Sequence, residues 1–311
     1  MSPPGPIIET DGANGGGTVR IFASTIELRT GAVTADGTTS DATGGTVRLS
    51  ASGPGPLLID ATITAQGRGS ADSDGGLVDV DGASIDVRAP INTSGSGSDG
   101  GPIMLSATAG DVTLASTASL NASAGTADGS GGTGGAIDVH ATGSIVVGGP
   151  VRTEGPGPDG DGGDVTLQAK GSVRIEDTIT TASTGADSSG GDIMLDAGAA
   201  VLIDARLDAS ASGSDASGGV VDVDASGDVT ISAGITVVAN GGGSGAGGLS
   251  IVSRTLVQVA GALVATASNG GPGGDIGIVG CAVTIDGTLD AGGASAPGAG
   301  LNRLTATALT I

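Results

Sequence analysis

The sequence predicts an all-β protein built as a single-stranded parallel β-helix, with about ten coils of about 28 residues and three short strands per coil. Three observations indicate this fold. A glycine pair recurs at a regular interval, apolar residues alternate with polar ones inside each interval, and polar glycine-rich segments separate the alternating runs. No window shows apolar positions spaced by three and four residues, the pattern typical of a helix.

The repeat is most regular in the middle of the chain. Glycines stand about 28 residues apart, and the second and fourth residues after each are apolar. Two further apolar runs begin ten and sixteen residues after each glycine. Because alternate side chains of a strand share a face, each run predicts a strand with one buried face. In the five most regular copies, the glycine and the two apolar residues that follow it are Gly135, Ile137 and Val139; Gly163, Val165 and Leu167; Gly191, Ile193 and Leu195; Gly219, Val221 and Val223; and Gly247, Leu249 and Ile251.

One such unit cannot bury its own apolar face, whereas stacked copies can. Toward both ends of the chain the period loosens at the turns, where a solenoid tolerates insertions. We therefore expect an irregular N-terminal segment at residues 1–14 and a parallel β-helix at residues 15–311. Its coils are expected to start near residues 17, 45, 76, 101, 135, 163, 191, 219, 247, 274 and 300.

Polar loops join the third strand of each coil to the next glycine pair. They are rich in Gly, Ser, Asp and Pro, the residues that turns favour. Since one such loop recurs in every coil, they are expected to form an acidic ridge along one edge of the rod.

Charge and composition restrict the class of function. The chain has 33 acidic and 11 basic residues, for a formal net charge of −22. Without a basic patch to neutralise phosphates, nucleic acid and anionic membrane surfaces are not expected as partners. No stretch approaches the roughly 18 apolar residues of a membrane span, so no membrane insertion is expected. Cys281 is the only cysteine, so no internal disulfide can form.

The alternating strands resemble the repetitive β-helical stalks of filamentous haemagglutinin-type and autotransporter-type bacterial surface proteins. The runs GGDVTLQA at Gly162–Ala169 and GSVRI at Gly171–Ile175 carry the resemblance, which covers residues 15–311. It implies a right-handed β-helix, an extracellular or cell-surface location, and a role as a spacer or adhesive stalk. The implied partner is a host or cell-surface protein or a glycan.

The two ends of the chain suggest that it is an internal piece. The first residues, MSPPGP, carry neither the positive charge nor the apolar run of a secretory signal peptide. At the other end, the apolar positions of the last coil stop in mid-coil, at Leu309 and Ile311. We expect the chain to belong to a longer exported protein, flanked by further repeats or domains.

Paired aspartates in two loops suggest calcium. Asp72 and Asp74, like Asp159 and Asp161, place carboxylates two residues apart in glycine-rich loops, which suits a hard cation. These four residues are the candidate metal ligands, and no other cofactor is expected. The alternative interpretation is that the carboxylates only solvate the loops.

The sequence predicts no catalysis. The alternative is a carbohydrate-active enzyme, a polysaccharide lyase or hydrolase, which would need two carboxylates, at least one with a shifted pKa. The aspartates that alternate with inward valines are predicted to point outward on a solvated face, as is His140, the only histidine. Cys281 is expected in the core or at a corner. The aspartates are Asp79, Asp81, Asp222 and Asp224.

Overall fold

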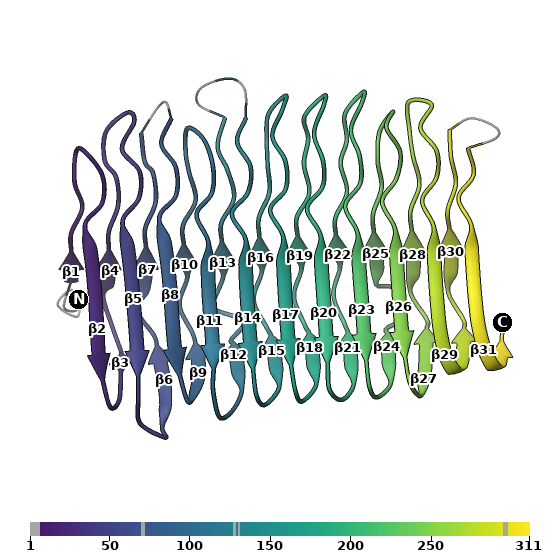
Figure 1. Ribbon diagram of the computed structural model, residues 1–311, viewed down its shortest axis with the longest axis horizontal. Helices are drawn as coiled ribbons and strands as arrows, with labels where there is room; N and C mark the ends of the chain where they lie inside the picture. Colours follow the sequence, from purple (N-terminus) through teal and green to yellow (C-terminus); the bar gives the residue numbers. More distant parts are fainter. Residues whose placement is uncertain (1–6, 70–71, 127–128, 130, 295–297) are drawn as a thin grey trace.

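The computed structural model is a β-solenoid of about eleven turns (Figure 1). It describes residues 7–69, 72–126, 129, 131–294 and 298–311. The predicted all-β parallel fold is confirmed: those residues contain no helix, and the strands of successive turns pair in parallel. The number of turns agrees with the eleven coil starts expected from the sequence. The described strands begin at β1 (Ile7–Glu9) and end at β31 (Asn302–Thr310).

The first strands of successive turns lie side by side along the whole rod. Their columns of inward residues begin at the apolar positions identified in the sequence. These strands are β2 (Thr18–Ala23), β5 (Thr46–Ala51), β8 (Leu77–Gly82), β11 (Ile103–Ala107), β14 (Ile137–Ala141), β17 (Val165–Ala169), β20 (Ile193–Ala197), β23 (Val221–Ala225), β26 (Leu249–Ser253), β29 (Ile276–Ile285) and β31.

The second strands follow after a corner and belong to the same 20-stranded sheet. In the last turns, β29 and β31 run through this corner without a break. The second strands are β3 (Glu27–Leu28), β6 (Pro56–Ile59), β9 (Ser84–Val87), β12 (Val112–Leu114), β15 (Ile145–Val147), β18 (Val173–Ile175), β21 (Val201–Ile203), β24 (Val229–Ile231) and β27 (Leu256–Val259).

The third strands form a separate 11-stranded sheet. The long loops that follow them all leave the rod along one edge, as expected from the sequence (Figure 1). The third strands are β1, β4 (Ala32–Thr34), β7 (Thr62–Thr64), β10 (Ile91–Asn92), β13 (Leu120–Asn121), β16 (Val151–Arg152), β19 (Ile179–Thr180), β22 (Leu207–Asp208), β25 (Thr236–Val238), β28 (Ala262–Val264) and β30 (Thr288–Asp290).

The N-terminal segment differs from the expectation for residues 1–14. Ile7–Glu9 form strand β1, which pairs in parallel with β4 and places Ile7 opposite Ala32. The backbone of β1 thereby occupies the hydrogen-bonding edge that β4 would otherwise expose. Residues 1–6 lie outside the described part of the chain.

The core is a set of aliphatic columns parallel to the rod axis. Val165 pairs with Ile193, and Ile193 with Val221, so the same inward position stacks from turn to turn. All three side chains are at most 1% exposed. One cluster of buried residues runs from Val19 to Ala291, so the interior is a single continuous core.

Successive turns close where a glycine pair meets a small residue at the end of the third strand, either alanine or threonine, and a glycine N–H donates to its carbonyl oxygen, as Gly163 does to Thr153 and Gly219 to Ala209. The buried Thr153 hydroxyl donates to the Gly163 carbonyl at 2.6 Å, and Thr181 makes the same bond to Gly191. A β-carbon at Gly162 would lie 1.8 Å from the Thr181 carbonyl oxygen, a contact that no other residue type could make without a shift. The glycine pair is therefore required by a close approach of two backbone segments.

Truncation of one column residue tests the role of the aliphatic columns. Leu195→Ala should lower the free energy of unfolding by about 2 to 5 kcal/mol, because Leu195 is fully buried and its removal leaves a cavity. Urea unfolding followed by circular dichroism measures the change. Met194→Ala is the matched control, since Met194 is the preceding residue of β20 and is 44% exposed. Equal losses in the two variants would contradict the proposed core.

Candidate functional site

The four predicted calcium ligands lie in two loops separated by three turns, so the two pairs cannot share an ion. Asp72 and Asp159 are exposed, and Asp72 has a positive φ of 36°. The Asp74 carboxylate accepts a hydrogen bond from the Asp99 N–H at 3.2 Å, and Asp161 accepts one from the Ser189 N–H at 2.6 Å. Nowhere in the described residues do three or more His, Cys, Asp or Glu side chains cluster as a metal site would require. Calcium binding stays a prediction.

The bonds of Asp74 and Asp161 are examples of a recurring contact between turns. An aspartate carboxylate in one turn accepts a hydrogen bond from a backbone N–H group of the next turn. The short aspartate side chain keeps its carboxylate close to the backbone, which is a physical reason for aspartate to outnumber glutamate in this chain. The same bond links Asp99 to Thr133, Asp111 to Ser144, Asp164 to Asp192, Asp192 to Val220 and Asp275 to Leu301.

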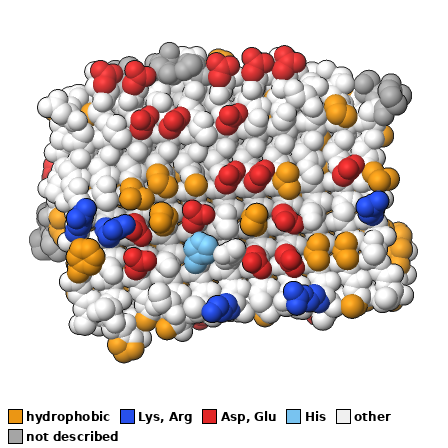
Figure 2. Space-filling model, in the orientation of Figure 1, with side chains coloured by type: hydrophobic (Ala, Val, Ile, Leu, Met, Phe, Trp, Pro, Cys, Tyr) orange, Lys and Arg blue, Asp and Glu red, His pale blue; other side chains and the backbone are white. Residues whose placement is uncertain are grey.

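The outer face of the first strands carries charged side chains of both signs (Figure 2). Asp222 is partly exposed and Asp224 exposed, which agrees with their predicted outward orientation. Asp79 differs from the predicted solvated position, since its side chain is only 8% exposed. Arg48 of the preceding turn lies opposite Asp79 and covers it, with an ion pair of 2.5 Å.

Asp81 shares the outer face of β8 with Asp79. Burial raises the pKa of the Asp81 carboxyl above its ordinary value, the negative charge of Asp79 raises this pKa further, and Arg48 opposes both effects. The two carboxylates therefore differ: Asp79 has a direct cationic partner and Asp81 has none among the described residues. Sequence spacing identified both aspartates but not Arg48, because Arg48 lies 31 positions before Asp79 in the chain.

A second buried carboxylate, Asp36, lies just after β4, the third strand of its turn. The Asp36 side chain is 1% exposed and pairs with Arg68 at 2.6 Å. It also accepts hydrogen bonds from the Thr64 hydroxyl at 3.1 Å and from the Gln66 N–H at 2.8 Å. Its three partners Thr64, Gln66 and Arg68 all belong to the next turn, so the carboxylate links two turns.

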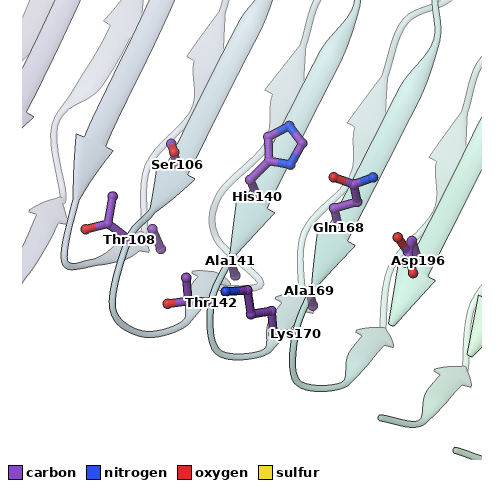
Figure 3. Close-up of a pocket in the computed structure, with 10 residues that line it drawn as sticks. Ser106, Thr108, His140, Ala141, Thr142, Gln168, Ala169, Lys170 and Asp196 are labelled. Carbon is purple, nitrogen blue, oxygen red and sulfur yellow. The ribbon is translucent and has the colours of Figure 1, made fainter. Parts of the chain in front are cut away.

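A shallow groove of about 450 Å³ crosses four turns, from β11 to β20 (Figure 3). One side is a row of outward residues, in which Ser106 pairs with His140, His140 with Gln168, and Gln168 with Asp196. Thr108, Thr142 and Lys170 line the other side, and buried alanines form the floor between them. The sequence prediction that His140 points outward is confirmed.

The groove contains the only lysine and the only histidine of the chain. Throughout the described residues, no hydrogen bond or ion pair engages the side chains of His140, Lys170 or Asp196. The arginines behave differently, since seven of them pair with a carboxylate: Arg29, Arg48, Arg68, Arg88, Arg152, Arg174 and Arg206. Sequence analysis missed the groove because its residues are about 28 positions apart and meet only when the turns stack.

Cys281 lies in β29, at the corner between the first and second strands. Its side chain is exposed and its thiol donates to the Arg254 carbonyl at 2.9 Å. The corner position agrees with the expectation, whereas the core alternative is wrong, because the side chain points to solvent.

Comparisons with known proteins yielded no matching family model, no matching curated protein and no matching solved structure. Within the described residues, no helix has the length and hydropathy to cross a membrane.

The aspartate bonds between turns can be tested at Asp192. Asp192→Ala removes the acceptor of the Val220 N–H and should lower the free energy of unfolding by about 0.5 to 1.5 kcal/mol. Asp192→Asn keeps an acceptor oxygen and should therefore lower the free energy of unfolding by less. Asp224→Ala, which removes the same charge at an exposed position, is the control. Urea unfolding measures the change. If Asp224→Ala lowers the free energy of unfolding as much as Asp192→Ala does, the change in net charge and not the lost hydrogen bond explains the effect.

The raised pKa of Asp81 predicts a pH dependence of stability. The folded chain holds the Asp81 proton more tightly than the unfolded chain, so this group stabilises the fold at low pH and the contribution is lost as pH rises through the raised pKa. Asp81→Asn should therefore gain stability relative to the parent chain as the pH rises above the ordinary pKa of an aspartate carboxyl. The gain should stay below about 1 kcal/mol because the carboxyl is partly solvated. Urea unfolding of both chains at a series of pH values measures the difference. If their free energies of unfolding change with pH in the same way, the prediction is contradicted.

Proposed function

We propose that this chain is a rigid, non-catalytic shaft of an extracellular or cell-surface protein, serving as a spacer or adhesive stalk. The observation that supports this most strongly is the in-register stacking of every turn on one continuous aliphatic core. Such a core joins the turns from Val19 to Ala291 into one packed unit. At the strand spacing of about 4.8 Å, eleven turns span about 50 Å.

The direction of the hydrogen bonds supports a mechanical role. Backbone bonds between turns run along the rod axis, and β1 and β31, the first and last described strands, lie at opposite ends of the rod (Figure 1). A pulling force between the ends is therefore carried by the bonds between turns, with the aliphatic columns resisting separation. The surface charge also suits a shaft, since a net charge of −22 keeps neighbouring rods apart.

The adhesive part of the proposal concerns the exposed surfaces. The loops leave one edge of the rod, and the outer face of the first strands presents polar side chains on a flat sheet (Figure 2). A host or cell-surface protein or a glycan is the proposed partner. Nucleic acid is not proposed because the described surface offers no large basic area.

Mechanical unfolding tests the shaft. With the full chain held by its two ends, we expect a series of ruptures as turns detach from the ends inward. Each turn of about 28 residues should release about 90 to 100 Å of chain. Force spectroscopy measures these increments. Loss of all turns in one event at low force would contradict the proposed role, because a spacer must keep its remaining turns when one is lost.

A carbohydrate-active enzyme is the second candidate, and two observations favour it. Asp79 is held by Arg48 while the neighbouring Asp81 has a raised pKa, a difference that acid–base catalysis requires. Phe22, the only aromatic residue, is 65% exposed on the same face and could contact a sugar ring. Binding to a glycan array without product release supports the shaft. Release of sugars from polysaccharides, abolished in Asp81→Asn, supports the enzyme.

A further inference from the structure

We infer that the groove between β11 and β20 binds a neutral, extended glycan, with its sugar residues following one another along the rod axis. The inference rests on the proposed adhesive function and names the site and the ligand class that would serve it. The volume of the groove, about 450 Å³, falls in the range of small-molecule sites.

The side chains of the groove suit hydroxyl groups. A sugar hydroxyl both donates and accepts hydrogen bonds, and the walls offer both functions. Asp196 accepts, Lys170 donates, and the Gln168 amide does both. None of the three side chains makes a hydrogen bond to another described residue, so each is available to a ligand.

The geometry suits a chain molecule parallel to the axis. Ser106, His140, Gln168 and Asp196 occupy the same position in four successive turns, so they recur at about 4.8 Å and span about 14 Å. The spacing is close to the length of one sugar residue in a straight β-linked glycan. The alanine floor, with Ala141 and Ala169 labelled in Figure 3, leaves room for the apolar faces of the sugar rings.

The charges favour a neutral ligand. Asp224 lies directly beside Asp196 in the next turn, and Asp138 lies two residues before His140 on the same face. These carboxylates, together with the net charge of −22, repel an acidic sugar. Lys170 inside the groove opposes a cationic one. A hydroxyl-rich molecule without charge meets neither repulsion.

Cellotriose, a straight neutral trisaccharide, is the probe for the experiment. Its binding to the full chain is followed by NMR through the ring signals of His140, which belong to this groove alone because the chain has one histidine. We expect saturable shifts with a Kd near about 1 mM. Trigalacturonate, the acidic probe, should bind at least tenfold more weakly, and maltotriose, which is curved, should also bind more weakly.

Matched variants locate the site. Asp196→Ala and Gln168→Ala should each weaken cellotriose binding about tenfold, through the loss of hydroxyl partners. Asp224→Ala is the control, because Asp224 occupies the same strand position one turn away, is also exposed, and does not line the groove. Equal weakening by Asp224→Ala, absence of shifts at His140, or tighter binding of trigalacturonate would each overturn the inference.

Failure of the groove and failure of the proposed function give different results. If cellotriose does not bind but other glycans on the array do, without turnover, the groove assignment is wrong and the adhesive shaft stands. If the array shows no binding and polysaccharides release product, the adhesive shaft itself is wrong.

Discussion

The register between successive turns is the constraint on which the rest of this structure depends. An inward residue is buried only if the residues above and below it in the column are also inward, because neighbouring turns supply most of its contacts. A shift of one residue in any turn would move its whole apolar set to the outside. The backbone bond from a glycine N–H to the carbonyl of a small residue, such as Gly163 to Thr153 or Gly219 to Ala209, closes successive turns at the same point of the repeat. Turns of similar length and matched register follow from these contacts.

The same register determines what the surface can do. Outward residues also form columns, so chemistry arises from side chains in different turns and not from a local motif. Arg48 and Asp79 pair because they occupy the same position in adjacent turns. The groove beside His140 forms for the same reason, from four turns. The high aspartate content has a partly structural explanation, since several carboxylates receive the backbone N–H of the next turn.

This structural use of aspartate changes how the acidic loops are interpreted. Asp74 and Asp161, half of the predicted calcium ligands, each accept a hydrogen bond from the following turn. Their carboxylates therefore have a role in the absence of any ion. Proximity of two carboxylates in a glycine-rich loop is a pattern that both a cation site and a turn-to-turn contact produce, and spacing in the sequence does not distinguish them.

The sequence alone determined the all-β parallel fold, the three strands per turn and the inward columns such as Val165, Ile193 and Val221. Those features depend on period-two alternation and on a fixed repeat, which can be counted along the chain. Only the tertiary structure decided the partners of the outward side chains, including the cover that Arg48 provides to Asp79 and the meeting of Gln168, Lys170 and Asp196 in one groove. The physical reason is that outward side chains are not constrained by burial, so their environment depends on side chains contributed by other turns.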